Sequence, residues 1–358
     1  MNLSSTVDSF QDEICKENAI SGSWEQNYSV ICDKFNCVGC PYFILTNSTI
    51  RVQNCIIDIS SWRCMLLALS ISTPTITELS VHNCHLSPQH LIDLTAALTQ
   101  SDYGPKVLRL EYLYFESAEE RQECMKNMDP LFTSDVKLEH LSLRSTSVDD
   151  EVLTSNAASL QSNFILKSLN LSCNNISDIG ANALLRVLRI NTILKEVSIS
   201  RNNISGESSF DTLQSLMVGS VCAPEDDVAL KANTKSIAEN NKKIKEMNKK
   251  RKKNGLAELP ELAAPKKDQA QKINGQLMLC NRTFSVLDMS LNPIDIKFLI
   301  SSLDVIRSRA GVAALVTAFG QCSPCIMMQM NAASGLEPLS IPPQTISQLS
   351  DIGISVLV

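Results

Sequence analysis

The most regular feature of the chain is an eleven-residue pattern of apolar and polar positions that occurs several times. The pattern reads LxxLxLxxNxL, mostly with Leu, Ile or Val at the apolar positions and polar residues between them. Its copies span 76–86, 138–148, 166–176, 194–204 and 284–294. Two copies depart from it at the Asn position, where Cys84 and Thr146 stand. Recurrence of one short pattern at regular spacing predicts stacked structural units.

The period is measured at the second apolar position of each copy, including two weaker copies around Ile50 and Leu108. That position is occupied by Ile50, Leu79, Leu108, Leu141, Leu169, Val197 and Leu287. The successive differences are 29, 29, 33, 28, 28 and 90 residues, and the last equals one 28-residue repeat plus an insertion of 62. The 33-residue step predicts a lengthened helix or loop around 116–132. A further step of 28 reaches Leu315, so a decayed eighth copy is expected over 312–322.

Each copy predicts a strand followed by a helix. The L-x-L core places two apolar side chains on the inner side of a short strand, and the residue between them faces outward. Apolar residues then recur at helical spacing over 87–98, 149–160 and 178–188, with Ile179 on the apolar stripe of the last segment. The expected fold class is α/β, a solenoid of about seven or eight units. Its parallel strands are expected on the concave face and its helices on the convex face.

The repeats resemble those of the leucine-rich repeat proteins, and their length near 28 residues resembles the ribonuclease-inhibitor-like subtype. The resemblance covers about 45–218 and 284–322 and implies a horseshoe that binds other proteins. A Lys-rich insertion before a late repeat reading Leu-Asp-Met-Ser-Leu-Asn-Pro-Ile is similar to ciliary members of this family. That similarity implies a non-catalytic structural subunit of an axonemal, microtubule-associated complex, located in the cytoplasm and the cilium or flagellum.

Composition changes along the chain divide it into five segments. We expect an N-terminal cap over 1–44, repeats over 45–218, a Lys-rich insertion over 219–283, late repeats over 284–334 and a C-terminal tail or cap over 335–358. Alternating apolar residues in the last segment predict a strand that covers the final repeat or, alternatively, pairs with a neighbouring protein. The sequence starts with no basic and apolar leader and has no apolar run of membrane-spanning length, so neither secretion nor membrane insertion is expected.

The insertion carries most of the basic charge. Residues 231–272 contain 13 Lys or Arg and 5 Asp or Glu, a balance of +8, whereas the whole chain is −6 and the remainder therefore −14. A thin heptad seam at Leu230, Ile237 and Ile244 predicts a helix over 225–253. The basic positions singled out are Lys242, Lys243, Lys245, Lys249, Lys250, Arg251, Lys252 and Lys253.

Three interpretations of this insertion stay open. It is a solvated loop with a charged helix, or a basic arm that docks on an acidic surface such as the tubulin lattice, or a nucleic-acid binder. Nucleic-acid binding is the weakest of the three, because no aromatic residues are interleaved with the basic ones.

Cysteine and histidine are the candidate metal ligands. The 13 cysteines are odd in number and mostly scattered singly, which is typical of reduced thiols packed as small apolar groups. A zinc site from Cys15, Cys32, Cys37 and Cys40 is an alternative, but its spacing is irregular, so we expect an N-terminal cap that uses cysteine as filler and no metal. The neighbouring histidines 82, 85 and 90 fall on a strand and on a helix and are expected to be structural or exposed.

No motif for a nucleophile, a catalytic metal or a phosphate-binding loop is present, so neither an enzyme, a cofactor nor a small-molecule substrate is expected. The outward strand positions are instead predicted to bind a protein partner, with a subunit of an axonemal complex or the tubulin lattice as the expected one. These positions are Arg51, Ser80, Arg109, Ser142, Arg144, Asn170, Ser172, Ser198, Ser200 and Asp288. A substrate adaptor of a ubiquitin ligase and a regulator of a small GTPase are the alternative functions.

Overall fold

The fold is given by a computed structural model that describes a large part of the chain. The described residues are 23–46, 48–71, 76–100, 104–205, 220–253, 261, 270–273, 276–279, 286–289, 292–293, 325–329 and 354–357. The chain divides into two compact units, Met1–Val148 and Asp149–Val358. In both units short strands alternate with helices, and the strands form an open, mostly parallel sheet.

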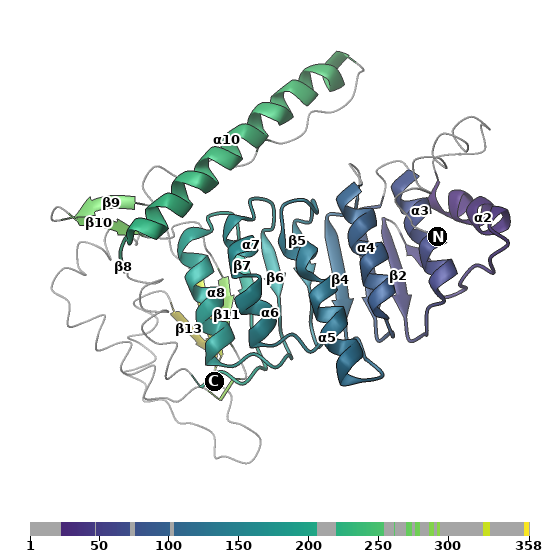
Figure 1. Cartoon of the computed structure of the whole chain (residues 1–358), viewed down its shortest axis with the longest axis horizontal. Helices are drawn as coiled ribbons and strands as arrows, with labels where there is room; N and C mark the ends of the chain where they lie inside the picture. The colour runs from purple at the N-terminus through teal and green to yellow at the C-terminus, as the bar shows by residue number, and fades with distance from the viewer. Residues whose placement is uncertain are drawn as a thin grey trace. The chain divides into compact units, whose positions relative to one another are not determined.

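The first unit contains a leading helix and then a strand–helix alternation. Its elements are α2 Trp24–Lys34, β1 Ile44–Thr46, β2 Thr49–Gln53, α3 Ile59–Ile71, β3 Glu78–His82, α4 Pro88–Gln100, β4 Val107–Glu111, α5 Ala118–Asn127, the 3-10 helix η1 Asp129–Phe132 and β5 His140–Ser142. The strands follow one another in the sheet in chain order, β1 antiparallel to β2 and the rest parallel. Helices α3, α4 and α5 cover one face of this sheet (Figure 1).

Strand pairing in this unit has the register that the repeat period predicts. Ile50 pairs with Leu79, Leu79 with Leu108 and Leu108 with Leu141. All four side chains are buried, at 2% exposure or less. The apolar positions therefore lie on adjacent strands and form a continuous core between sheet and helices.

The second unit repeats this arrangement and contains the insertion. Its elements are α6 Asp150–Ser155, α7 Ala157–Ser162, β6 Ser168–Asn170, α8 Asp178–Ile190, β7 Glu196–Ser198, β8 Ser220–Val221, α10 Pro224–Lys253, β9 Ala270–Ile273, β10 Gln276–Leu279, β11 Val286–Asp288, β12 Cys325–Gln329 and β13 Ile354–Leu357. The strand order of its main sheet is β6-β7-β11-β12-β13. Strands β8, β10 and β9 form a separate antiparallel sheet.

The main sheet of the second unit continues across the insertion. Leu169 pairs with Val197, and Val197 pairs with Leu287, although 90 residues separate the last two. The prediction of one repeat plus an insertion is thus confirmed at this pairing. The next parallel strand is β12, with Ile326 opposite Leu287. The eighth copy was expected earlier in the chain, over 312–322, which lies outside the described residues.

The end of the chain adds a final strand to this sheet. Strand β13 pairs in parallel with β12, so a strand near the C-terminal end is present as predicted. It lies at the edge of the sheet of its own chain. The curvature of the predicted horseshoe and the number of repeats stay predictions.

The helices agree with the predicted segments with two exceptions. Segment 149–160 is divided into α6 and α7 at Asn156, whose side-chain amide donates to the Val152 carbonyl at 3.0 Å. An Asn that bonds to a nearby backbone carbonyl competes with helix continuation. Ile179 was expected on the buried stripe of α8, but it is 64% exposed, and Gly180 and Ala181 in the next turn are buried instead. The lengthened 33-residue repeat is accounted for by α5 followed by the turn η1.

A residue with positive φ follows each of the strands β2 to β7 at the same position. Asn54, Asn83, Tyr112 and Ser145 have this conformation in the first unit and Cys173 and Arg201 in the second, with φ between 51° and 59°. The successive spacings are 29, 29, 33, 28 and 28 residues, which repeat the period of the apolar positions. Asn adopts this left-handed region far more readily than other non-glycine residues do. The turn after the strand is therefore part of the repeat.

The described residues of the insertion form a helix and three short strands. Helix α10 matches the segment predicted to be helical, and Ile237 and Ile244 on its predicted seam are buried at 2% and 8% exposure, whereas Met247 is 45% exposed. The antiparallel pair β9 and β10 was not predicted, although Asn274-Gly275 between them is a strong sequence signal for a hairpin. No helix in the described part of the chain has both the length and the apolar character needed to cross a bilayer.

Candidate interaction surface

The outward strand positions of the first unit form one row. Pairing places Arg51 beside Ser80, Ser80 beside Arg109 and Arg109 beside Ser142. Their neighbours along each strand are the buried core residues, so these four side chains point to the face opposite the helices. The two arginines are exposed, whereas Ser80 and Ser142 are buried at 8% and 4% exposure. The row is therefore a surface of long basic side chains separated by small, covered hydroxyls.

Acidic side chains hold this row in place. The Arg109 Nε lies 2.8 Å from Glu78 Oε1, and its Nη1 lies 3.8 Å from Glu111 Oε1. Ser142 Oγ donates to Glu111 Oε1 at 2.6 Å. Glu78 was not among the predicted positions, although it is two residues before Ser80 in the same strand and therefore faces the same side.

Tyr112 stands next to this row in an unfavourable backbone conformation. Its φ is 56°, at the turn position where the two preceding repeats have Asn54 and Asn83. Its ring lies 4.8 Å from the His82 ring, and the Arg144 guanidinium carbon lies 5.3 Å above its centroid. The Tyr112 amide also donates to the Arg144 carbonyl at 2.9 Å. The sequence analysis missed Tyr112, and the only available signal was an aromatic residue one position before the Asn position of the repeat, where the two preceding repeats have Asn54 and Asn83.

Arg144 has unused hydrogen-bonding capacity. Its Nε is buried and has no hydrogen-bond partner, and no ion pair to its guanidinium is present among the described residues. The ring of Tyr112 is the contact that positions it. We call Glu78, His82, Arg109, Glu111, Tyr112, Ser142 and Arg144 the strand-face cluster. It combines fixed charges, one aromatic ring and an arginine that lacks an acceptor.

The predicted positions of the second unit are also brought together, but they bond mainly to one another. Asn170 pairs in register with Ser198, and Ser198 with Asp288. Ser172 Oγ donates to Asn170 Oδ1 at 2.6 Å, and Ser198 Oγ donates to Asp288 Oδ2 at 2.8 Å. Ser200 Oγ lies 3.0 Å from Ser172 Oγ, and both serines are buried. This serine row offers few free donors to a partner.

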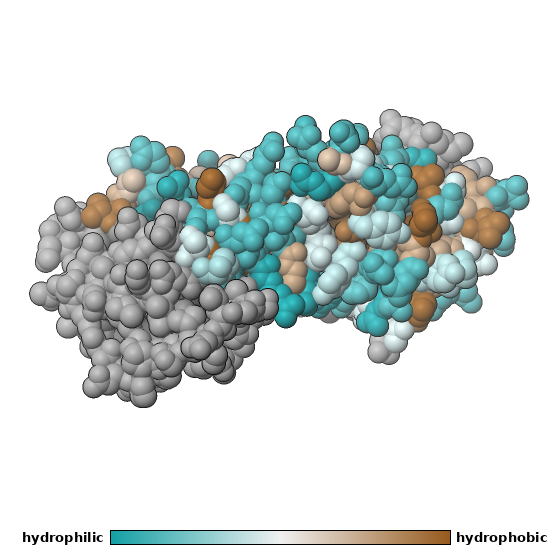
Figure 2. All heavy atoms as spheres, turned by 90° about the horizontal axis from the view of Figure 1, so that it is seen from below, coloured by the Kyte–Doolittle hydropathy of each residue, from teal (hydrophilic) through white to brown (hydrophobic). Residues whose placement is uncertain are grey.

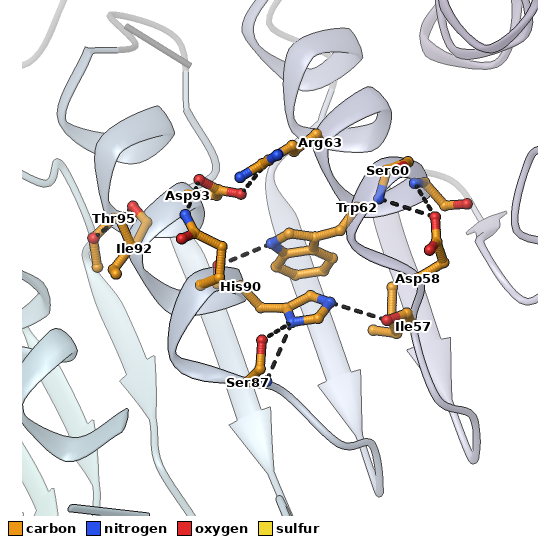
Figure 3. A network of polar contacts seen from close by, with 12 residues as sticks. Ile57, Asp58, Ser60, Trp62, Arg63, Ser87, His90, Ile92, Asp93 and Thr95 are labelled. Atoms are coloured by element: carbon orange, nitrogen blue, oxygen red, sulfur yellow. Dashed lines mark hydrogen bonds and ion pairs between the residues drawn. The ribbon is translucent and has the colours of Figure 1, made fainter. Parts of the chain in front are cut away.

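The polar network around His90 resembles a serine–histidine pair but has a structural role (Figure 3). Ser87 donates through its amide and its Oγ to His90 Nδ1, at 3.2 and 2.7 Å, and His90 Nε2 donates to the Ile57 carbonyl at 3.0 Å. Trp62 Nε1 donates to the His90 carbonyl at 2.9 Å. Both imidazole nitrogens are occupied, and the residue is only 5% exposed. The buried imidazole therefore joins the start of α4 to the Ile57 carbonyl.

The three neighbouring histidines do not form one site. The His82 ring lies tilted by 60° against the Tyr112 ring, His85 Nε2 lies 3.1 Å from Glu120 Oε1, and His90 is in the buried network. Each is held by a different part of the first unit, as the expectation of structural or exposed histidines implied.

The four cysteines weighed as an alternative zinc site are only partly brought together among the described residues. Cys32 and Cys37 lie together with Cys64 of α3, and the three side chains have their sulfur atoms within 4.8 Å of one another. The Cys40 thiol does not belong to this group, and Cys15 lies outside the described residues. No sequence spacing connects Cys64 to the other two, so only packing of α2 on α3 reveals it. Of the two later cysteines, 322 and 325, the first also lies outside the described residues.

Helix α10 presents the predicted basic residues. Lys242, Lys243, Lys245, Lys249, Lys250, Lys252 and Lys253 are exposed, and Arg251 belongs to the same helix. The helix begins at Pro224 and has Glu225, Asp226 and Asp227 in its first turn. Acidic residues at the N-terminal end and basic ones at the C-terminal end both complement the helix dipole. The start of α10 is attached to the second unit by an Arg189–Asp226 ion pair at 3.1 Å and by Asn233 Nδ2 donating to the Gln161 carbonyl at 2.7 Å.

Apolar surface is limited on the face seen in Figure 2. Small brown patches lie over the N-terminal elements and are separated by polar residues. Exposed apolar side chains of the first unit include Ile56, Ile92 and Tyr114, at 76%, 41% and 43% exposure. Single exposed apolar side chains of this kind are ordinary on protein surfaces.

Comparison with known proteins agrees with the repeat pattern. A family profile described as "Leucine Rich repeat" matches residues 162–185, which include β6 and the start of α8. A search of curated proteins gave no match. Among solved structures, the chain is similar to "Leiomodin-1 Actin-Binding Site 2 (ABS2)", with 18% identity, 54% of this chain and 99% of that chain covered, and a TM-score of 0.27. The profile match, set among strands that pair in the predicted register, supports a leucine-rich repeat protein.

Proposed function

We propose that this protein is a non-catalytic scaffold that binds a protein partner through the outward face of its strands. Leucine-rich repeats are generally interaction modules, and the repeat match supports that role. The strand-face cluster is the part of this face best suited to recognition, because its charged side chains are already held in place by one another. Groups that are ordered before binding lose less conformational entropy when a partner arrives.

The unpartnered Arg144 is the observation that carries this proposal. A buried donor without an acceptor is uncommon in proteins and costs about 1–3 kcal/mol. A carboxylate of the partner would pair with the Nη atoms of Arg144, which are not among the buried unpaired atoms, since guanidinium and carboxylate groups form paired hydrogen bonds. Tyr112 keeps the guanidinium in place although its own backbone conformation is costly, which fits a binding role more than a purely structural one.

The test is partner binding by charge-reversed variants. Arg144→Glu should weaken capture of the native partner at least tenfold, and Tyr112→Asn should weaken it while relieving the backbone conformation. Lys126→Glu is the matched control, because Lys126 is exposed on α5, on the helical side of the same unit. Thermal unfolding of each variant separates loss of binding from loss of folding. Unchanged capture by Arg144→Glu would show that the partner binds elsewhere.

For the cellular role we propose a structural subunit of an axonemal, microtubule-associated complex. The support is the resemblance in repeat order and insertion placement to leucine-rich repeat-containing protein 71, a ciliary protein. The exposed lysines of α10 add to it, because they suit the acidic surface of a tubulin lattice. This role implies a location in the cytoplasm and in the ciliary or flagellar axoneme.

Affinity purification from ciliated cells, followed by mass spectrometry, tests this role. Enrichment of tubulin and axonemal proteins, lost with the Arg144 or α10 variants, is the expected result. Enrichment of cullin-ligase subunits would instead identify a ubiquitin-ligase adaptor. Accelerated GTP hydrolysis by a captured small GTPase would identify a regulator of that class.

A further inference from the structure

We propose that Cys32, Cys37 and Cys64 bind a zinc ion, with the three thiolates as ligands and water in the fourth position. Their sulfur atoms lie within 4.8 Å of one another. Zinc–sulfur bonds of about 2.3 Å in a tetrahedron place sulfur atoms about 3.8 Å apart, so shifts of about 1 Å complete the geometry. The ligand set includes a residue that no sequence spacing suggested, and it is independent of the proposed partner surface.

The end of helix α2 brings the first two thiols together. The Asn36 backbone has φ 48°, the Cys37 amide donates to the Cys32 carbonyl at 2.9 Å, and the Asn36 amide donates to the Asp33 carbonyl at 3.2 Å. These are the hydrogen bonds of a Schellman motif, in which the residue after the left-handed position contacts the residue five positions earlier. That contact is usually between two apolar side chains, but here both are cysteines. The four residues between Cys32 and Cys37 also match the spacing of zinc-binding pairs.

Helix α3 contributes the third thiol. Cys64 is 4% exposed and lies one helical turn after Ser61, whose Oγ is 3.6 Å from the Cys37 sulfur. Residues three apart on a helix share a face, so Ser61 and Cys64 both point toward the end of α2. A bound ion would therefore connect α2 to α3, at the N-terminal end of the repeats.

The surroundings of these thiols suit a buried metal with one accessible side. Zinc binds cysteine in its thiolate form. Binding of Zn²⁺ forms three Zn–S bonds and releases three protons to solvent, which makes binding weaker at low pH. Cys37 is only partly buried and offers an entry path.

Other thiols of the same unit lack this arrangement. Cys55 and Cys84 have sulfur atoms 3.9 Å apart, but among the described residues no third ligand completes a group with them. Cys124 is fully buried, and its Sγ donates to the Leu86 carbonyl at 3.4 Å. These cysteines fit the role of apolar filler and provide matched controls.

The experiment is metal analysis of the full chain purified under reducing conditions and reconstituted with Zn²⁺. One zinc per chain is expected, together with thiolate-to-cobalt charge-transfer absorption after replacement by Co²⁺. Cys32→Ser, Cys37→Ser and Cys64→Ser should each weaken binding at least tenfold, and Cys84→Ser and Cys124→Ser should not. Cys37→Ser keeps the result interpretable if substitution of the two buried cysteines prevents folding.

Two results would overturn the proposal. One is a reconstituted wild-type protein, correctly folded by circular dichroism, that binds no zinc and shows no cobalt charge-transfer band. The other is zinc that is retained by the Cys37 and Cys64 variants and lost by Cys84→Ser, which would place the ion at different thiols. Partner capture through Arg144 is measured separately, and its failure leaves this result unchanged.

Discussion

At the residue scale, buried polar side chains are the most informative feature of this protein. His90 has both ring nitrogens hydrogen-bonded inside the first unit, as donor to a carbonyl and as acceptor from Ser87. Burial lowers its pKa, and His85 acts in the same direction, whereas the Ile57 carbonyl, Asp93 and Asp58 oppose the shift. His90 is therefore neutral in the folded state.

This protonation state predicts acid sensitivity of folding. Because the folded-state pKa lies below the unfolded value near 6.5, the unfolded chain binds the proton first, and stability falls as pH decreases below about 6.5. Urea unfolding between pH 7.5 and 5 should show this loss in the wild type. His90→Gln should be less stable at pH 7.5 but less dependent on pH.

The exposed His140 is the control for that measurement. His140→Gln should keep the pH dependence of the wild type, since its side chain contacts solvent rather than a closed network. Equal pH dependence of the wild type and His90→Gln would contradict the assignment of a neutral buried imidazole.

At the element scale, an asparagine ladder connects successive strand turns of the second unit. Asn202 Oδ1 accepts from the amides of Asn174 and Ile176, at 3.2 and 3.1 Å, and its Nδ2 donates to the Leu171 and Ile199 carbonyls. Asn292 makes the same kind of contacts one strand further on, with the Asn202 amide and the Ile199 carbonyl. One side chain thus satisfies backbone groups of two neighbouring repeats.

The first unit fills the same position differently. Cys84 donates to the His82 carbonyl at 3.4 Å, Thr146 Oγ1 donates to the Leu143 carbonyl at 2.7 Å, and Leu113 offers no hydrogen bond. The turns of the first unit are closed by packing and single bonds, while those of the second depend on asparagine.

Loss of one ladder asparagine should therefore be costly. Asn202→Ala leaves two buried amides without an acceptor and is expected to lower the free energy of unfolding by about 3 kcal/mol. Asn175→Ala is the matched control, because this neighbouring side chain is exposed and should cost less than about 0.5 kcal/mol. Urea unfolding followed by circular dichroism measures both. Equal small losses for the two variants would mean that the ladder contributes little.

At the scale of the whole molecule, the separation of charge is the main property. The Lys-rich window carries +8 and the remainder −14, and the basic half of α10 extends beyond α7 and α8 of its own unit (Figure 1). Attraction between exposed charges is screened within about 8 Å at physiological ionic strength. Docking of α10 on an acidic lattice should therefore be strongly dependent on salt.

Microtubule co-sedimentation can measure this dependence. Affinity should fall several-fold between 50 and 300 mM salt, and the combined variant Lys242→Glu, Lys245→Glu and Lys249→Glu should abolish binding at both. Arg186→Glu, an exposed charge on α8, should leave binding unchanged. An affinity that is indifferent to salt, or equal in both variants, would assign α10 to the role of a solvated helix.

The sequence alone determined the repeat strands β2 to β7 and β11, the register of the pairs described above and the helix of the insertion. The reason is local, because apolar and polar residues alternate along a strand and so fix which side chains face the core. A register shift of one residue would expose every apolar side chain of the strand. Pairing of Val197 with Leu287 across 90 residues followed from the period alone. The strand near the C-terminal end and the helix over 224–253 could also be predicted from apolar periodicity.

Only the tertiary structure decided which side chains act together. Cys64 joins Cys32 and Cys37 because α2 packs on α3, and Tyr112 lies between His82 and Arg144 because three successive turns meet. The division of the helix at Asn156 and the exposure of Ile179 likewise depend on neighbours that periodicity does not describe. A repeat pattern constrains each unit by itself, whereas sites form between units, where side-chain direction and distance are set by packing.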